Sequence, residues 1–442
     1  MCLTPFTNPH LQAIREWVII AAYANSYASC NRSVQWVRFL MNQISPTVSS
    51  ETLSREAVQR WQTANYYAAF IVLGLASGSL GPTLPGLAAQ TGILLGDAGV
   101  FFTARSLGYL LGSFQGGRLY DRLRGNRLMA VLLALLAVAL GLIPVVPAKW
   151  VLVAVILLLG MAEGSIDVGG NTLLVWVHGT NVGPFMNGLH FFWGVGAFLA
   201  PIIVAMILSL SSGIAWAYGL LAVAVLPVAV WTLRLPSPFP AKKPASDSTQ
   251  STNQILILLI AALWFLYIGT EVTFGGWIYS YVVTLEIGAE TQAAYLSSAF
   301  WGALTFGRLL AVPVAARVRP GLILLTDFGV ALVSSVVLAV LGTQSVALWV
   351  GTIGLGLALA SVIPTTISFA ESRMAVSGRV TSWLFVGGSA GGMTVPWLVG
   401  RFFNSVGPRF TMVAIVVDLS LALILLGGLL VYSRRTTPSV GQ

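Results

Sequence analysis

Charge, cysteine and histidine are all scarce in this chain of 442 residues. Charged residues make up 8% of it, whereas a soluble domain carries roughly 25%, so the chain lacks the charge needed to cover a globular surface. The two cysteines, Cys2 and Cys30, exclude a disulfide framework and a cysteine-rich metal site. The three histidines, His10, His178 and His190, are too scattered to suggest a metal cluster. No Walker-type phosphate loop appears, so these absences together argue against a soluble or nucleotide-driven enzyme.

Apolar residues are abundant instead, at 57% of the chain. Runs such as 131–146 and 255–269 approach the length of about 20 residues that a membrane-spanning helix needs. From residue 64 onward we predict twelve spanning helices, and hence an all-α membrane protein. The twelve apolar segments are 64–89, 96–119, 127–147, 149–177, 184–209, 213–234, 255–284, 291–316, 319–342, 346–370, 380–402 and 409–432.

The lysines and arginines that give the net charge of +9 are concentrated in alternate connections between these segments. This is the pattern that the positive-inside rule expects of cytoplasmic loops, and it does not indicate a nucleic-acid partner. We therefore predict a multi-pass protein of the plasma (inner) membrane, a monomer with both termini in the cytoplasm. The basic connections hold Arg118, Arg122, Arg124 and Arg127, then Arg234, Lys242 and Lys243, then Arg317 and Arg319, with Arg434 and Arg435 in the tail.

A polar stretch rich in proline and serine, 235–253, separates six segments from six and reads as a flexible linker. The first 60 residues contain an apolar stretch with helical spacing from Leu11 to Ala28, too short to span a bilayer. It is compatible with an amphipathic helix on the membrane surface, and also with a dispensable extension or a mis-assigned start ahead of Met41. The predicted division is 1–60 extension, 61–234 first bundle, 235–253 linker, 254–433 second bundle and 434–442 cytoplasmic tail.

The two halves of the chain repeat each other. Gly112, Gly117 and Arg118 at the end of the second segment match Gly302, Gly307 and Arg308 at the end of the eighth. The stretch 192–201 in the fifth segment likewise matches 387–396 in the eleventh, with a proline at the end of each. Transporters built from two parallel six-helix halves bind their solute near the midplane between the halves.

The connection between the second and third segments carries a motif that also indicates a transporter. It contains Gly117, Asp121 and Arg122, followed by Gly125 and Arg127, and the second glycine lies one position later than in the family pattern. Over residues 64–433 the chain resembles the major facilitator superfamily. The resemblance implies two pseudo-symmetric six-helix bundles that alternate in access, with a gate of charge pairs at the cytoplasmic face. The gate residues would be Gly117, Arg118, Asp121, Arg122 and, from the second copy, Arg308; positive-inside markers without a gating role are the alternative.

Three further stretches, 160–172, 187–197 and 269–277, resemble the sugar-symporter branch that contains fucose permeases and sodium-dependent glucose transporters. The glucose-transporter side is the closer of the two, because the first segment has no acidic residue. The resemblance implies a sugar as the solute.

Buried charge points to the ion-coupling site. Glu163, Asp167 and Asn171 recur every four residues in the fourth segment, which places them on one helical face. An ionisable group at mid-membrane costs about 2.5–3.5 kcal/mol, so such groups are usually paired or functional. We predict that Glu163 and Asp167 couple transport to a proton or a sodium ion. The alternative is structural pairing with a neighbouring helix, for which Arg105 is a candidate.

Polar and aromatic side chains on other segments supply candidate solute contacts. Glu271, the acidic residue deep in the seventh segment, is flanked by glycines that would permit local unwinding, as would the Gly/Pro-rich stretch 78–85 in the first. The Glu271 carboxylate could accept hydrogen bonds from sugar hydroxyls, ligate a cation, or accept hydrogen bonds from backbone N–H groups freed at a helix bend. Hydrogen-bonding groups beside a flat aromatic face are typical of sugar sites, although packing or an interfacial aromatic belt would use the same residues. The predicted solute contacts are Asn171, Asn187, His190, Trp193, Glu271 and Trp277.

The sequence thus favours coupled symport of a small neutral solute, a hexose, with no cofactor beyond the transported proton or sodium ion. A proton-driven exporter of amphipathic compounds and a non-transporting membrane scaffold or sensor are the alternatives. Asp327 and Asp418, in the ninth and twelfth segments, are expected to be structural partners of nearby polar groups.

Overall fold

The computed structural model describes residues 50–210, 213–238, 253–374 and 378–436. The chain divides into two units, Met1–Val58 and Gln59–Gln442. Of the first unit only Ser50–Val58 is described, as the start of helix α3, so the amphipathic helix predicted within 11–28 lies outside the described residues. Most of the predicted linker and of the C-terminal tail lies outside them too.

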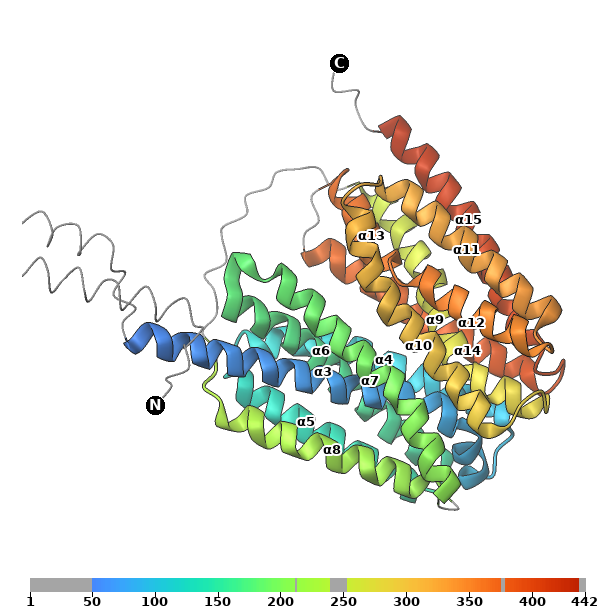
Figure 1. The fold of residues 1–442 in the computed structure, drawn as a ribbon, viewed down its shortest axis with the longest axis horizontal. Helices are drawn as coiled ribbons and strands as arrows, with labels where there is room; N and C mark the ends of the chain where they lie inside the picture. Colours follow the sequence, from blue (N-terminus) through green and yellow to red (C-terminus); the bar gives the residue numbers. More distant parts are fainter. Residues whose placement is uncertain (1–49, 211–212, 239–252, 375–377, 437–442) are drawn as a thin grey trace, which may run out of the picture. The chain divides into compact units, whose positions relative to one another are not determined.

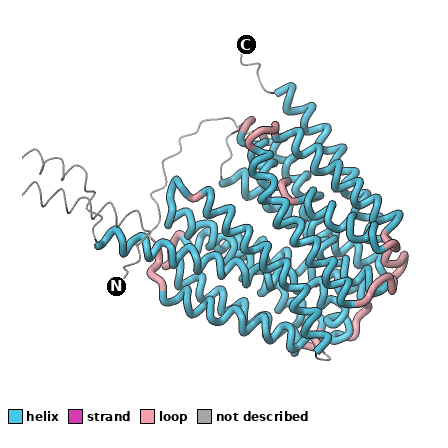
Figure 2. Tube along the Cα trace, viewed as in Figure 1, coloured by secondary structure: helices cyan, strands magenta, loops and turns pink. Residues whose placement is uncertain are grey.

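The described part of the chain consists of helices joined by short loops, without a strand, and forms the twelve predicted segments (Figures 1 and 2). The first six are α3 (Ser50–Thr91), α4 (Gly99–Tyr120), α5 (Gly125–Leu142), α6 (Lys149–His178), α7 (Gly183–Leu210) and α8 (Ile214–Arg234). The second six are α9 (Gln254–Thr284), α10 (Glu290–Ala315), α11 (Pro320–Leu341), α12 (Ser345–Leu359) with α13 (Val362–Glu371), α14 (Gly378–Phe403) and α15 (Phe410–Thr436). The all-α prediction and the two six-helix bundles are confirmed.

Ten of the twelve segments are long and apolar enough to cross a membrane by length and composition. The two that fall short are α4, the second helix of the first half, and α14, the fifth helix of the second half, and they pack against each other. Both are rich in glycine and carry arginines, such as Arg105 in α4 and Arg401 in α14. Helices that lie between the bundles need less apolar surface than helices that face lipid.

Helix continuity differs from the prediction at three places. The α3 helix begins at Ser50 and runs through both Pro82 and Pro85, and α9 runs unbroken past Gly275, so the expected local unwinding is wrong. The interruption lies instead in the tenth segment, where α12 ends at Leu359 and α13 begins at Val362. The glycines of α3 and α9 serve close packing: a Cβ at Gly81 would lie 2.7 Å from the carbonyl oxygen of Gly275.

The sequence repeat reappears as a repeat in packing. In the first half a Cβ at Gly196 of α7 would lie 2.0 Å from the carbonyl oxygen of Ile71 in α3. In the second half a Cβ at Gly391 of α14 would lie 1.9 Å from the carbonyl oxygen of Phe265 in α9. Because only glycine permits this approach, each half packs its fifth helix against the backbone of its first in the same way.

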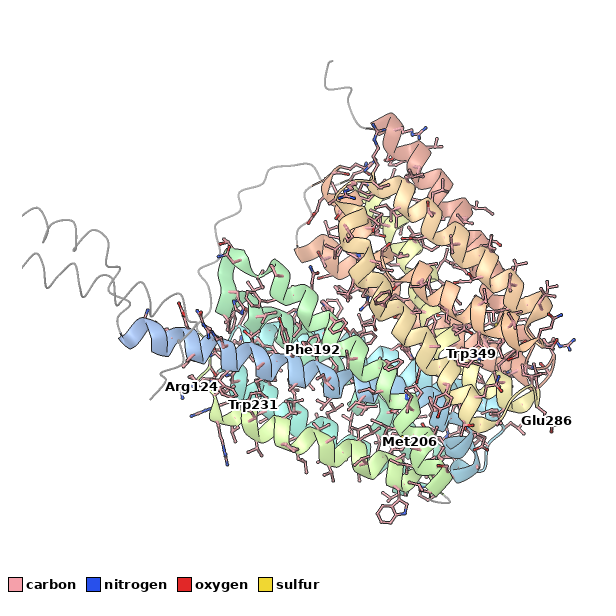
Figure 3. All side chains as sticks on the ribbon, viewed as in Figure 1. Arg124, Phe192, Met206, Trp231, Glu286 and Trp349 are labelled. Atoms are coloured by element: carbon pink, nitrogen blue, oxygen red, sulfur yellow. The ribbon has the colours of Figure 1, made fainter. Side chains whose placement is uncertain are left out.

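The two bundles touch along α4 with α14 and α7 with α10. Near the start of α4, Thr103 Oγ1 donates to the carbonyl oxygen of Met393 at 2.8 Å, and the N–H of Gly96 donates to Asn404 Oδ1 at 3.3 Å. These contacts lie at the end of the bundles opposite the one that carries Arg234 and Gln254. Figure 3 marks the two ends: Arg124 labels the end nearer Arg234, and Glu286 labels the other.

Candidate functional site: a central cavity between the bundles

A cavity of about 960 Å³ lies between the two bundles. Its inner end is formed where Gly81 and Phe102 of the first half meet Gly275 and Gly276 of the second, a contact hereafter called the floor. The lining extends from the floor to Ala315 and Pro320 at the α10–α11 turn, which shares its end of the bundles with Arg234 and Gln254. The cavity therefore reaches the end that carries the predicted linker and is sealed at the other.

Glycines bring the most polar wall of this cavity together. A Cβ at Gly160 or Gly164 of α6 would lie 2.1 Å from the carbonyl oxygen of Arg105 or Tyr109, respectively, and a Cβ at Gly112 of α4 would lie 2.0 Å from that of Met161. The small-xxx-small spacing on both helices allows their backbones to touch. Polar side chains from α4 and α6 consequently meet in the same register.

Two pairs result, each joining residues 58 positions apart. Arg105 forms a bidentate ion pair with Glu163, in which Nε donates to Oε2 at 2.7 Å and Nη2 donates to Oε1 at 2.9 Å. The Arg105 side chain is 18% exposed and the Glu163 side chain 2%. One helical turn further on, Tyr109 Oη donates to Asp167 Oδ2 at 2.6 Å. Asn171 Nδ2 donates to the carbonyl oxygen of Asp167 at 2.8 Å and to its Oδ1 at 3.3 Å.

The two acids of the predicted coupling pair therefore differ. Glu163 is neutralised by a bidentate ion pair with Arg105, as the structural alternative expected. Asp167 has an aromatic hydroxyl and an amide as its hydrogen-bond partners, and both are neutral. His190 lies close enough to Asp167 to interact with it electrostatically. The spacing of the acids on one face was correct, but only the neighbouring helix shows which acid has a cationic partner.

The α7 wall presents the other predicted first-half contacts to the cavity. Asn187 is exposed, His190 is partly buried and packs edge-on against Phe70, and Trp193 lies nearer the floor. Together with Asn171 these side chains line one side of the cavity. The structure thus brings an amide pair, an imidazole and an indole to one surface.

The second half contributes a different cluster. Glu271 lines the cavity and is 8% exposed, and the buried Tyr267 hydroxyl, one turn earlier on α9, donates to its carboxylate. Arg308 of α10 also lines the cavity, close enough to Tyr267 and Glu271 to interact with both electrostatically. Its guanidinium carbon lies over the ring of Trp193, 5.5 Å from the centroid.

The placement of Arg308 corrects the prediction that it belongs to the gate. Its counterpart Arg118 lies two residues before α4 ends at Tyr120, whereas α10 continues seven residues beyond Arg308 to Ala315. At 1.5 Å per residue the difference of five residues puts Arg308 roughly 7.5 Å deeper in its helix. Arg308 is a cavity residue, and the sequence match alone did not show this difference in depth.

Trp277 does not line the cavity in this structure, contrary to its predicted role in solute contact. Its side chain is fully buried behind the floor, between Phe102 and Phe403, at ring-centroid distances of 5.9 and 4.8 Å. Its Nε1 donates to the carbonyl oxygen of Pro396 at 3.2 Å, so its polar atom is already used. Trp277 stabilises the closed end of the bundles.

The motif connection lies away from the cavity. Arg118, Asp121 and Arg122 are exposed at the end of α4 and in the turn that follows, and no atom would meet a Cβ at Gly117. The neighbouring Asn126 is buried and binds the chain after α8, with Nδ2 donating to the carbonyl oxygen of Pro236 at 2.8 Å. The gating role of the motif stays a prediction.

Sequence reasoning missed Tyr109 and Tyr267, the two hydroxyl donors to the cavity acids. A signal for Tyr109 was present, because it follows Arg105 by four residues just as Asp167 follows Glu163. Outside the cavity, Asp327 accepts a hydrogen bond from Ser361 at the break between α12 and α13, and Asp418 accepts one from Thr270 at 2.6 Å. Both acids have the structural partners that were expected.

Two six-helix bundles around a central cavity with one polar wall are the architecture of a membrane transporter. The profile of the Major Facilitator Superfamily matches residues 66–396, and the chain belongs to that family. A sodium-dependent glucose transporter 1 from Homo sapiens is 28% identical over 372 residues, covering 75% of this chain and 72% of that protein. The protein of the same name from Danio rerio is 31% identical over 378 residues, covering 77% and 64%.

Solved transporters share the fold. The nucleoside transporter NupG superposes with a TM-score of 0.68 at 15% sequence identity, covering 84% of this chain and 99% of that one. A peptide transporter, POT, gives a TM-score of 0.68 at 14% identity, covering 85% and 94%. At this identity the likeness shows the fold and not the solute. Membership of the Major Facilitator Superfamily makes the chain a solute transporter and not an enzyme, and it confirms the resemblance to that family.

Proposed function

We propose that this protein is a secondary active transporter that moves a hexose or a similar small neutral solute together with one cation, held at Asp167. The observation that carries the proposal is the difference between the two acids of α6. Glu163 has a bidentate arginine partner, whereas Asp167 is hydrogen-bonded by the neutral side chains of Tyr109 and Asn171. An acid at this depth without a paired cation is costly, and a proton or sodium ion would supply the missing charge.

The charge balance of the whole cavity supports a single coupling ion. The described lining contains two arginines and three acids, which gives a net charge of −1 with His190 neutral. Arg105 balances Glu163, and Arg308 lies near enough to balance Glu271, so the surplus falls on Asp167. One monovalent cation makes the site neutral, and it then accommodates a neutral solute at the lowest electrostatic cost.

The first-half wall has the chemistry that a polyol requires. Asn187 and His190 offer donors and acceptors, and Trp193 offers a flat apolar surface for the face of a sugar ring. Relatives named sodium-dependent glucose transporter 1 cover most of the chain at similar identity, which also favours a hexose. With the predicted topology, the cavity in this conformation opens to the cytoplasm, and rocking of the bundles would close it and open the floor.

A proton-driven exporter of amphipathic compounds is the second candidate, because most other lining side chains are apolar. Those near the floor and on the second half include Leu80, Phe102, Trp264, Ile268, Val272, Trp301, Ile363 and Phe385. A proton-driven exporter would expel an apolar dye in exchange for protons that enter down their gradient, and it would not accumulate hexoses. The direction of transport therefore separates the two candidates.

The test is uptake of labelled hexoses by the purified full chain in proteoliposomes, under a proton gradient or a sodium gradient imposed separately. We expect accumulation under one of the two gradients, and we expect Asp167→Asn to abolish it while retaining exchange of labelled for unlabelled hexose. The exposed Glu290→Gln, in the first turn of α10, is the matched control and should accumulate hexose as the native chain does. Full accumulation by Asp167→Asn would reject the assignment.

A further inference from the structure

Arg308 is placed for a role that neither the family motif nor the charge balance assigns to it. It belongs to the second half, yet its guanidinium lies against an aromatic side chain of the first half, at the level where both halves line the cavity. Cation–π contacts act within about 6 Å of the ring centroid, so the 5.5 Å separation from Trp193 is a real interaction.

The ring that holds Arg308 is itself held in place. Trp193 packs edge-on against Trp301 of the second half, with ring centroids 5.7 Å apart and an interplanar angle of 88°. The next residue, Gly194, lies so close to α10 that a Cβ there would be 2.0 Å from Thr305 Oγ1. Because α7 and α10 approach this closely, the Trp193 ring beside the guanidinium has little freedom to move.

Most hydrogen-bonding capacity of Arg308 is left for something in the cavity. A guanidinium carries five N–H donors in a planar fork and has no acceptor. The contact with Trp193 is a cation–π contact and not a hydrogen bond, and the single Tyr267 oxygen cannot engage all five donors. Within the part of the chain that the structure describes, several N–H groups therefore remain for a ligand in the cavity that Arg308 lines.

We propose that Arg308 is a solute-recognition residue whose guanidinium fork donates to two adjacent hydroxyl oxygens of a neutral polyol. The proposal rests on the proposed function, and it identifies a pair of adjacent hydroxyl groups as the part of the solute that the second half recognises. A planar fork matches a pair of neighbouring oxygens, which a single ammonium cannot do. A carboxylate or phosphate would fit the fork as well, but the net negative charge of the cavity opposes an anion.

This arrangement also explains why Arg308 contacts both halves. A solute bound by the fork lies beside Trp193, so it touches the first half through the ring and the second half through the hydrogen bonds. Binding then draws together the two bundles that must rock against each other. The solute would be held most tightly when both walls are close.

The experiment compares Arg308→Lys with the native chain in proteoliposome exchange, which needs no ion gradient. The solutes are one transported hexose and a set of its monodeoxy analogues. We expect Arg308→Lys to raise the KM for the hexose by about tenfold, the cost of losing a charged hydrogen bond. For the analogues that lack either hydroxyl of the recognised pair, the KM should change by less than about threefold, because the native chain has already lost part of that contact.

Controls make each outcome decisive. Arg317→Lys, at an exposed position just beyond α10, should leave every KM as in the native chain. Trp193→Phe keeps an aromatic ring under Arg308 and should raise the hexose KM by less than Arg308→Lys does.

An equal rise in KM for all analogues, or a fall in Vmax alone, would contradict solute recognition by Arg308. If the native chain exchanges hexose but does not accumulate it under any gradient, only ion coupling fails. If it neither binds nor exchanges any hexose, both proposals fail.

Discussion

The two halves of the cavity balance their buried acids in different ways. In the first half, Arg105 contacts Glu163 directly with two hydrogen bonds, and a further acid, Asp167, remains beyond the pair. In the second half, a tyrosine hydroxyl donates to Glu271, and Arg308 interacts with both from nearby. The direct pair forms a rigid structural unit, whereas the indirect arrangement leaves the arginine available to a ligand. Under the two proposals above, the first half carries the ion-coupling acid, and both halves contact the solute, the second through Arg308.

The largest expected effect concerns the direct pair. Glu163→Gln should lower the free energy of unfolding by about 3–5 kcal/mol, because it leaves Arg105 as an uncompensated buried charge. Replacing both residues, with Arg105→Met and Glu163→Gln together, should recover more than half of this loss. Thermal unfolding in detergent measures both variants. Equal destabilisation by the single and double variants would show that the pair is not the structural unit described above.

The matching change in the second half should cost less. Glu271→Gln removes a charge whose arginine stands further away and whose hydroxyl donor can also serve an amide oxygen. We expect a loss of about 1–2 kcal/mol, in the range of one hydrogen bond to a charged group. The same unfolding assay applies, and Glu290→Gln is the exposed control. If Glu271→Gln proved as damaging as Glu163→Gln, the contrast between the halves would be lost.

A smaller effect is expected at the hydroxyl that contacts Asp167. Tyr109→Phe removes a donor to the carboxylate, so one oxygen becomes available to the coupling cation, whether this is a proton or sodium. The half-saturating cation concentration should fall by about fivefold, corresponding to about 1 kcal/mol. Titration of hexose uptake against cation concentration measures the change. An increase in that concentration would mean that Tyr109 helps to bind the ion instead.

The smallest expected effect on solute affinity is at Trp277. Because its side chain lies behind the floor, Trp277→Phe should change the hexose KM by less than about twofold, or roughly 0.4 kcal/mol. Trp193→Phe, in contact with the cavity, is the matched aromatic comparison and should have the larger effect. A rise in KM of tenfold or more for Trp277→Phe would place that side chain in the site in some other conformation.

The sequence predicted the fold closely because the same pattern of apolar segments and glycines occurs in each half. Apolar length located the twelve segments, and the glycines at 196 and 391 recur because the same helix pair packs on the same backbone in each half. The break at residues 360–361 had one local signal, Pro364 in the first turn of α13, but Pro82 and Pro85 gave a similar signal in α3, which is not interrupted. Tertiary packing keeps α3 continuous in spite of its prolines.

The site was harder to predict, because partners come from other helices. The four-residue spacing showed that Glu163 and Asp167 share a face, but the register of α4 against α6 decides that Arg105 meets Glu163 and Tyr109 meets Asp167. Arg308 was misplaced because its motif match gives the order of residues and not the length of α10. Trp277 was misplaced because the sequence does not show where along α9 the two bundles close: its side chain faces the first half, against Phe102, but lies behind the floor.

One surplus negative charge in the cavity, located at Asp167, is the central claim, and the charge carried per solute tests it most directly. Currents evoked by a rapid increase of hexose on reconstituted protein, compared with tracer uptake on the same proteoliposomes, give that ratio. The account predicts one positive charge per hexose for the native chain and for Glu290→Gln, and none for Asp167→Asn. A native ratio of zero, or an unchanged ratio in Asp167→Asn, would contradict it.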